Sequence, residues 1–272
     1  MSGLIDIGAN LLSNHFDTDL DKVLTRAHTA GVERILITAS NLAAVPEILG
    51  LIRANRSRSG WPKLYTTAGI HPHEAASAPA GFESTLIDWF RDPDVVSAGE
   101  AGLDYNRNFS PKDVQRQVFS TQIEAARAAD MPLFVHDRES DGDTLALLHS
   151  GSVNPERIVI HCFTGTALEL DAYLDAGYRI GITGWVCDRK RGELLRSLVP
   201  RIPLDRLMIE TDAPWLLPQD LPAPERKRMN RRNEPASLPH IATTLARLME
   251  VDPEVLAETT RANSIRFFRL AV

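Results

Sequence analysis

Short apolar runs alternate along this chain with longer segments in which apolar residues recur every three or four positions. After the first run, Leu20, Val23, Leu24 and Ala27 follow the spacing of one helical face. The same alternation continues to the C-terminus, which is typical of strand–helix units around a parallel sheet. It predicts strands at residues 4–7, 34–38, 64–70, 95–99, 133–135, 158–160, 178–182 and 207–209. Helices are expected at about 20–27, 43–54, 82–90, 111–129, 141–148, 168–176, 188–198, 238–249 and 253–266.

This count of strands and helices predicts an α/β fold, the (β/α)8 or TIM barrel. The 272 residues are close to the roughly 250 that such a barrel needs, so we expect one catalytic domain over residues 1–272. A doubly wound sheet is the alternative, but no GxGxxG or GxxxxGK[ST] motif follows the first strand to support a nucleotide-binding version. Residues 214–235, rich in Pro, Lys and Arg, are expected to form a long basic loop after the eighth strand.

Composition narrows the class of protein. The chain is 43% hydrophobic and 24% charged, close to the average for a globular protein that buries its own core. Its net charge of −6 excludes an overall positive potential that would attract a polyanion to the whole surface. A histone-like binder is therefore disfavoured, whereas a nuclease that contacts nucleic acid through a metal or a local basic patch stays open.

Cysteine content and the N-terminus bear on location. Cys162 and Cys187 are too few for a disulfide framework and lack the paired spacing of a structural zinc site. The start, MSGLIDIGAN, has no basic region followed by an apolar one, and no run of about 18 apolar residues occurs. We expect a cytoplasmic protein that is neither secreted nor membrane-spanning.

Polar residues of metal-ligand type follow most of the predicted strands. Because the carboxyl ends of barrel strands converge on one face, we expect these side chains to meet there. They are Asp6, Asn10, His71, His73, Glu100, His136, His161 and Asp212. Carboxylates favour Mg2+, Mn2+ or Ca2+ and imidazoles favour Zn2+, Co2+ or Mn2+, so the mixture predicts a divalent ion without choosing one.

Each of these residues also has a structural interpretation. A single histidine beside a strand is more often hydrogen-bonded within the fold than bound to a metal. Asp6 can bond neighbouring backbone instead of an ion. Asp104, in the turn expected after Glu100, is interpreted as capping that turn rather than binding metal. The agreement of several strand ends is what favours the metal site.

Candidate substrate contacts lie beside these residues. Arg138, two positions after His136, would lie on the same side of an extended chain and could hold a phosphate. Residues 225–232 (ERKRMNRR) form a dense basic run in which Arg231 and Arg232 could attract a nucleic-acid backbone, although such runs are often only solvated. Tyr105, Phe163 and Trp215 could stack bases or simply pack.

The motifs together resemble the TatD family of metal-dependent deoxyribonucleases. The resemblance runs over essentially the whole chain and in the family's order. It rests on IDIGAN (5–10), GEAGLDYNRNFSP (99–111), VHDR (135–138), HCFTG (161–165), GITGWVCDRKRG (181–192), IETDAPWL (209–216) and RRNEP (231–235). It implies a TIM barrel related to the amidohydrolases that hydrolyses phosphodiester bonds in DNA, typically with Mg2+.

The resemblance also implies roles for particular residues. The family's metal and catalytic positions fall on Glu100, His136, His161 and Asp212, and His71 matches a substrate-phosphate or additional metal histidine. Many members carry a His-x-His pair after the first strand, where this chain has Gly8, Ala9 and Asn10. A glycine cannot ligate and an amide oxygen is a weak ligand, so we expect one tightly bound ion and a second that is weak or brought by substrate.

We therefore predict a Mg2+-dependent exonuclease that acts on single-stranded or frayed DNA ends. A wider substrate range would include RNA. Mn2+ and Zn2+ are the alternative ions. Glu100, His136 and His161 would hold the principal ion and Asp212 would deprotonate the attacking water. His71, His73, Arg138 and Tyr105 are candidate contacts to phosphates or bases. A monomer is expected. The alternatives are an amidohydrolase-like enzyme acting on a small amide, ester or lactone, and a non-catalytic nucleic-acid-binding barrel.

Overall fold

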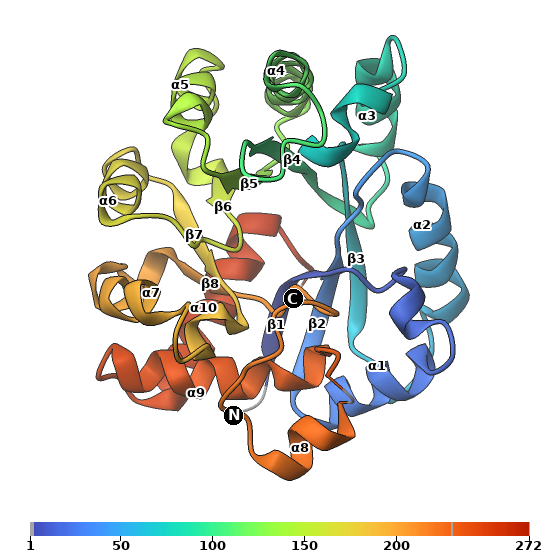
Figure 1. The fold of residues 1–272 in the computed structure, drawn as a ribbon. Coiled ribbons are helices and arrows are strands. Elements are labelled where there is room, and N and C mark those ends of the chain that lie inside the picture. Colours follow the sequence, from blue (N-terminus) through green and yellow to red (C-terminus); the bar gives the residue numbers. More distant parts are fainter. Residues whose placement is uncertain (1–2, 230, 272) are drawn as a thin grey trace.

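The alternating strands and helices close into a barrel. The computed structural model describes residues 3–229 and 231–271. Its eight strands are parallel and lie side by side in sequence order. They are β1 (Leu4–Ala9), β2 (Val32–Ile37), β3 (Lys63–Ala68), β4 (Val95–Asp104), β5 (Leu133–Arg138), β6 (Ile158–Ile160), β7 (Arg179–Ile182) and β8 (Leu207–Ile209). The predicted (β/α)8 barrel is confirmed, with its helices arranged around the strands (Figure 1).

The barrel closes just beyond the end of β8. Ala9 and Ala213 form an isolated parallel bridge. The backbone N–H of Asn10 donates to the carbonyl of Ala213 at 2.7 Å, and that of Asp212 donates to the carbonyl of Gly8 at 2.9 Å. This junction brings Asn10 and Asp212, which are 202 positions apart, to the same point of the barrel mouth.

The helices pack their apolar faces on the outside of the barrel. In α1, for example, the predicted face of Val23, Leu24 and Ala27 is buried. The helices are α1 (Leu20–Thr29), α2 (Ala44–Asn55), α3 (Phe82–Trp89), α4 (Lys112–Ala128), α5 (Asp143–Ser150), α6 (Ala167–Asp175), α7 (Glu193–Leu198), α8 (Ala223–Arg228), α9 (Leu238–Leu248) and α10 (Pro253–Phe268). Within residues 3–229 and 231–271, none is long and apolar enough to cross a membrane.

Strand β4 is longer than the sequence pattern predicts. Its pairing with β5 is interrupted after Ala98 and then resumes from Ala101 to Asp104. The pattern fails here because Glu100 and two glycines interrupt the apolar run that marks a strand. The continuation turns Asp104 from an expected turn residue into the last residue of a barrel strand.

The segment 214–235 follows β8 as predicted, but it is not a loop throughout. It contains α8, whose prolines at positions 222 and 224 stand at the start of the helix, where proline is tolerated. The basic run 225–232 begins in this helix, and its residue Asn230 lies outside the described residues. In Figure 1, α8 projects at the edge of the barrel mouth.

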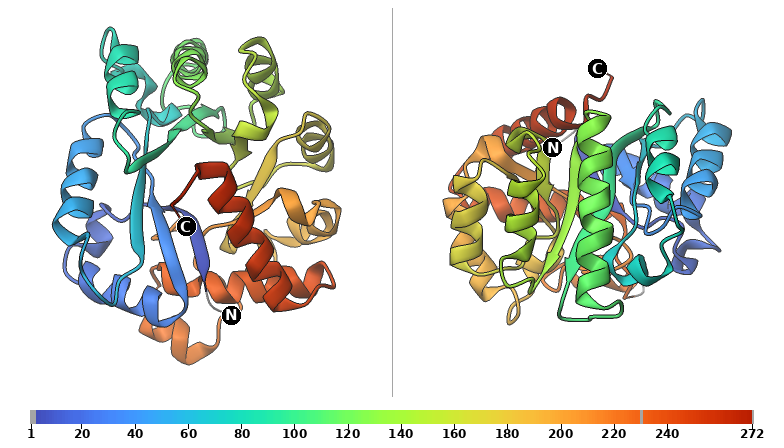
Figure 2. Two further views of the ribbon diagram at one scale, coloured as in Figure 1. Left: turned by 180° about the vertical axis from the view of Figure 1, so that it is seen from behind. Right: turned by 90° about the horizontal axis from the view of Figure 1, so that it is seen from above.

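The opposite end of the barrel is filled by apolar side chains. Ile5, Tyr65 and Val96 from early positions of three strands pack with Phe267 and Phe268 of α10. Seen from behind, α10 lies in front of the strands (Figure 2, left). Since this end is closed by core packing, polar chemistry is confined to the C-terminal ends of the strands, as in other TIM barrels.

Candidate active site

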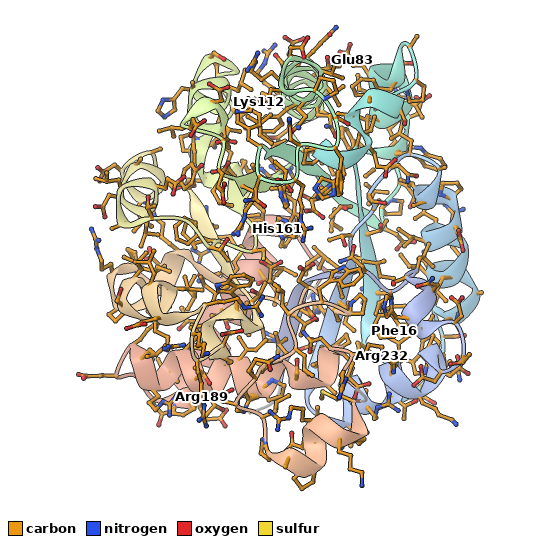
Figure 3. All side chains as sticks on the ribbon, in the orientation of Figure 1. Phe16, Glu83, Lys112, His161, Arg189 and Arg232 are labelled. Atoms are coloured by element: carbon orange, nitrogen blue, oxygen red, sulfur yellow. The ribbon has the colours of Figure 1, made fainter. Side chains whose placement is uncertain are left out.

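A pocket of about 1020 Å3 opens at the C-terminal ends of the strands. Its wall contains all four predicted principal residues, Glu100, His136, His161 and Asp212. The predicted accessory residues Asn10, His71, His73 and Arg138 line it too. Figure 3 shows His161 near the centre of the barrel mouth. The convergence expected from the strand ends is thus present in the structure.

Glu100 is the centre of the polar cluster. Its Oε1 atom lies 2.7 Å from Nε2 of His161, 2.9 Å from Nδ1 of His136 and 3.2 Å from Nε2 of His71. The carboxylate is only 6% exposed, so these imidazoles replace the water that a charge needs. Although burial raises it, the pKa of Glu100 is held well below its usual range by His161 and His71.

The three imidazoles have different environments. Burial opposes a charge on His136, but the nearby carboxylate of Asp104 and the hydrogen bond with Glu100 raise its pKa to about 9. Burial likewise opposes a charge on His161, and Glu100 and Glu210 raise its pKa well above the usual range. For His71, burial dominates and lowers the pKa. The surrounding carboxylates thus favour positive charge on His136 and His161, but not on His71.

Asp104 belongs to this cluster in addition to its predicted role in the turn after Glu100. Its Oδ2 lies 2.6 Å from Nε2 of His73 and 3.6 Å from Nε2 of His136. Its Oδ1 does accept the backbone N–H of Arg107 at 2.7 Å, so the turn role is also real. Burial would raise the pKa of Asp104, but the nearby His136 ring and the hydrogen bond with His73 lower it strongly.

Glu210 is a second carboxylate that the sequence did not single out. It is fully buried, accepts the backbone N–H of Cys162 at 2.5 Å and lies 3.4 Å from Nδ1 of His161. It thereby fixes the ring so that Nε2 faces Glu100, as carboxylates do behind metal-binding histidines. A Cβ at Gly8 would lie 2.5 Å from Oε2 of Glu210. The space that a side chain at position 8 would need is therefore filled by this carboxylate.

Asp212 stands on the other side of the pocket. Its Oδ1 accepts the side-chain amide of Asn10 at 3.1 Å, and the oxygen of that amide accepts the hydroxyl of Thr38 at 2.8 Å. Burial, together with the nearby charges of Glu100 and Glu210, raises the pKa of Asp212 to about 8, although His161 lowers it. Asn10 thus positions Asp212.

Asp6, considered as a possible ligand, does not line the pocket. Its carboxylate accepts the backbone N–H and the hydroxyl of Thr211 at 2.9 and 2.6 Å and the backbone N–H of Gly8 at 3.3 Å. The interpretation as a partner of neighbouring backbone therefore holds for Asp6, which joins the middle of β1 to the residues just after β8.

The donor set fits a divalent ion. One ligand atom from each of His71, Glu100 and His136 lies within 4.8 Å of the others. Among the described residues, Nε2 of His136 is also a buried polar atom without a partner at hydrogen-bond distance, because Oδ2 of Asp104 lies 3.6 Å away. A buried nitrogen left unpaired among carboxylates is costly, and coordination would satisfy it.

The predicted arginine contacts separate into different roles. Arg138 lines the pocket, and its guanidinium donates to Thr164 at 2.5 Å. Arg232 instead forms a two-point ion pair with Asp19 at 2.8 and 2.9 Å and lies over the Phe16 ring (Figure 3). The described partners of Arg232 are therefore structural, and its predicted contact with nucleic acid stays a prediction. Arg231 is exposed and outside the pocket lining, and its contact with nucleic acid stays a prediction.

The aromatic predictions are only partly right. Trp215 lines the pocket and is 50% exposed. Tyr105 points elsewhere, because its hydroxyl donates to Asp143 at 2.6 Å, and Phe163 is buried against Tyr173. The sequence missed two other rings on the pocket wall. These are Phe109, which is 67% exposed and packs on His73, and Trp185.

Fold and cluster together define this chain as a TIM barrel of the metal-dependent hydrolase type. The model of the TatD-related DNase family matches residues 5–269, and the chain belongs to this family. It is 42% identical over 269 residues to a protein of Citrobacter rodentium named 3'-5' ssDNA/RNA exonuclease TatD, covering 99% of both chains. It is 44% identical to proteins of the same name from Rahnella sp. and Pectobacterium atrosepticum, covering 98% of this chain and 99% and 100% of theirs.

Solved structures agree with this placement. A hydrolase of the TatD family from Entamoeba histolytica superposes with a TM-score of 0.86 at 28% identity, covering 98% of each chain. YjjV, a TatD homologue from Escherichia coli, superposes with a TM-score of 0.87 at 23% identity, covering 99% of each chain. At that identity the second likeness concerns the fold alone.

Proposed function

We propose that this protein is a Mg2+-dependent exonuclease that removes nucleotides from the 3' end of single-stranded DNA and also acts on RNA. The observation that carries the proposal is the convergence of three imidazoles on Glu100, opposite Asp212, in one pocket with exposed aromatic rings on its wall. The names of the relatives support the substrate and the 3'-to-5' direction.

Glu100, His136 and His161 would hold the principal ion, with His71 beside them. When bound, a divalent ion supplies Lewis acidity toward a phosphoryl oxygen and toward water. The carboxylates favour Mg2+ among hard ions, and the imidazoles leave Mn2+ and Zn2+ as alternatives for the experiment. A second ion would be weak, since Gly8 offers no side chain and Asn10 is engaged with Thr38 and Asp212.

Asp212 would accept the proton of the attacking water. A carboxylate whose pKa lies near the working pH is an effective general base. Burial raises the pKa of Asp212 to about 8. The Asn10 amide occupies Oδ1, so we assign the proton to Oδ2. Arg138, fixed by Thr164, would orient a phosphate on the pocket wall.

The aromatic rings of the pocket wall would select unpaired strands. Phe109, Trp185 and Trp215 come from three different connecting segments and line one pocket. A base can stack on such a ring only when it is free of its own duplex stack, and each stacked base contributes about 1–3 kcal/mol. This supports single-stranded or frayed ends as substrate.

The small-molecule alternative has no specific support. Amidohydrolases of that kind often use a carboxylated lysine between two metals, and no lysine is among the described residues that line the pocket. A purely binding barrel would not need the buried cluster around Glu100. Cytoplasmic location, a monomeric state and a part in DNA degradation or repair remain elements of the proposal.

The decisive assay uses single-stranded DNA labelled at either end. With Mg2+, we expect a 3' label to be released at once as a mononucleotide and a 5' label to shorten progressively, while EDTA stops both. Mn2+ and Zn2+ arms test the ion, and an RNA strand and a blunt duplex test the substrate. Release of the 5' label first would reverse the direction. Hydrolysis of a small ester without loss of either label would overturn the proposal.

A further inference from the structure

A second group of metal-ligand side chains lies outside the active site. It consists of Cys187, the last residue of the 3-10 helix η4 (Gly184–Cys187), Asp220 in the segment after β8, and His240 in the first turn of α9. One ligand atom from each lies within 4.8 Å of the others. Ligand atoms around a tetrahedral zinc lie roughly 3.3–3.7 Å from one another. Small side-chain rotations would therefore bring these three ligand atoms to tetrahedral zinc geometry.

The residues of this group are held in place by their surroundings. His240 Nε2 lies 2.7 Å from Asp220 Oδ1, and both side chains are about one-quarter exposed, at 27% and 26%. Cys187 is buried, with its Sγ 3.7 Å from the hydroxyl of Thr244, one helical turn after His240 on α9. The thiol therefore faces the same side of α9 as the imidazole.

The backbone that carries Cys187 is fixed by one arginine. The guanidinium of Arg196 donates to the carbonyls of Val186, Asp188 and Arg189 at 3.2, 2.5 and 2.8 Å. Its charge is thus engaged with backbone dipoles. The other arginines beside the group, Arg189 and Arg247, are exposed, so water and salt screen their repulsion of a cation. Figure 3 shows Arg189 away from His161, toward the α9 side.

We propose that Cys187, Asp220 and His240 form a second metal site that takes Zn2+. A thiolate, an imidazole and a carboxylate are the ligands that zinc prefers, and three protein ligands leave the fourth position open. That position would face the adjoining pocket of about 600 Å3, which these three residues help to line. The site is independent of the proposed nuclease chemistry.

An ion here would join three segments, two of which carry aromatic rings of the substrate pocket. The η4 turn also carries Trp185, and the segment before Asp220 carries Trp215, both on the wall of the substrate pocket. Bound zinc would therefore restrain Trp185 and Trp215, two of the three aromatic rings that the proposed function assigns to substrate stacking. Its expected signature is higher thermal stability and tighter binding of single strands.

Co2+ can report on this site as a probe for zinc. Metal-free protein titrated with Co2+ should develop an intense near-ultraviolet charge-transfer band that only a thiolate ligand produces. We expect Cys187→Ser to remove the band and to weaken zinc binding beyond the roughly 10–100-fold loss typical of a supporting residue. The matched control, Cys162→Ser, changes the other thiol and should keep the band.

Two further variants separate the possible outcomes. His240→Gln should weaken the band even if Cys187→Ser folds poorly, which circular dichroism would reveal. Glu100→Gln disables the proposed nuclease centre and should leave the band unchanged, so the two proposals can fail separately. Absence of the band in the unaltered protein, its survival in Cys187→Ser, or its loss in Cys162→Ser would overturn the zinc site.

Discussion

Asp212 allows proton transfer to be tested apart from metal binding. Asp212→Asn keeps the size of the side chain and its contact with Asn10 but removes the base. We expect kcat to fall by about 100- to 10,000-fold, the usual contribution of a positioned general base. Mn2+ affinity, measured by titration, should change by only a few-fold, because Asp212 is outside the tight group of His71, Glu100 and His136. Activity retained within a few-fold would remove Asp212 as the base.

Asp104 supports the histidines and should affect the metal more than the proton transfer. Asp104→Asn leaves a neutral group opposite His73 and His136. We expect metal affinity to fall by about 10–100-fold, as for other carboxylates behind ligating histidines, and excess metal to restore most of the activity. The measurement is activity as a function of free Mg2+. Activity lost even at saturating metal would make Asp104 a direct ligand.

A neighbouring residue provides the control for this variant. Asp137 lies on β5 opposite Leu103, the residue before Asp104 on β4. The Asp137 carboxylate accepts hydrogen bonds from Thr144 and Tyr173 and does not line the pocket. Asp137→Asn should leave the Mg2+ dependence unchanged while lowering stability. An equal shift in both variants would indicate a general effect of disturbing the two strands.

The sequence predicted that the four principal candidates would meet at the barrel mouth because strand ends converge in any TIM barrel. Glu100, His136, His161 and Asp212 follow from that rule without knowledge of side-chain contacts. The sequence predicted the turn contact of Asp104 but not its place on the pocket wall. Once β4 extends to Asp104, alternation places Asp104 and Tyr105 on opposite sides of the chain, so the acid enters the pocket and the ring leaves it.

At the scale of elements, the approach of β4 to β5 requires a glycine. Gly102 has φ +148°, and a Cβ there would lie 1.9 Å from the carbonyl oxygen of His136. Gly102→Ala should therefore cost about 3 kcal/mol in the free energy of unfolding and displace His136. Urea unfolding measures the first effect and metal titration the second.

The control is another glycine with free space around it. Gly50 lies within α2, and an added Cβ would have no neighbour within 4 Å among the described residues. Gly50→Ala should stabilise the protein by about 0.5–1 kcal/mol, because alanine loses less conformational entropy in a helix. Equal loss of stability in both alanine variants would contradict the role given to Gly102.

Arg232 ties the segment after α8 to the start of α1. Its hydrogen bonds to Asp19, opposed by partial burial, lower the pKa of that carboxylate. We expect Arg232→Ala to lower the free energy of unfolding by about 2 kcal/mol at pH 7, the value of charged hydrogen bonds. Because the folded pKa is the lower one, this stability exists above the unfolded pKa of about 4 and is lost as the pH falls through the folded pKa.

Unfolding measured from pH 7 down to strongly acidic pH tests this sign. The difference between the unaltered protein and Arg232→Ala should shrink toward acid. Exposed Arg231 provides the control, and Arg231→Ala should change stability by less than about 0.5 kcal/mol at any pH. A constant difference across the pH range would mean that Arg232 acts through its packing on Phe16 instead.

Periodicity was sufficient to predict the order and the type of the strands. It was not sufficient for α8, because the prolines and charged residues of 222–228 are typical of a loop. In addition, a six-residue helix has too few turns to show a periodic pattern of apolar residues. It also could not show that Arg232 has a partner 213 positions away in Asp19. Such contacts depend on the barrel closing, which no local pattern encodes.

At the scale of the whole molecule, electrostatics oppose the proposed substrate until an ion is bound. The chain carries a net charge of −6, and the pocket wall has more carboxylates than arginines. The carboxylates are Glu47, Glu74, Glu100, Asp104 and Asp212, and the arginines are Arg107, Arg138 and Arg191. A phosphodiester brought to this wall meets repulsion unless a cation offsets the acids.

Binding of single-stranded DNA should therefore depend on the metal as much as cleavage does. Asp212→Asn permits the test, because it would bind the strand without degrading it. We expect Mg2+ to tighten binding by about 10–100-fold over EDTA, equivalent to the roughly 1.5–3 kcal/mol of a charged contact. Arg138→Ala, added to that variant, should lower the slope of log Kd against log salt by about 0.7 if one phosphate contact is lost. Arg232→Ala, which breaks only a structural pair, should leave that slope unchanged. Equal affinity with Mg2+ and with EDTA would mean that the arginines and the aromatic rings hold the strand without help from the Glu100 cluster.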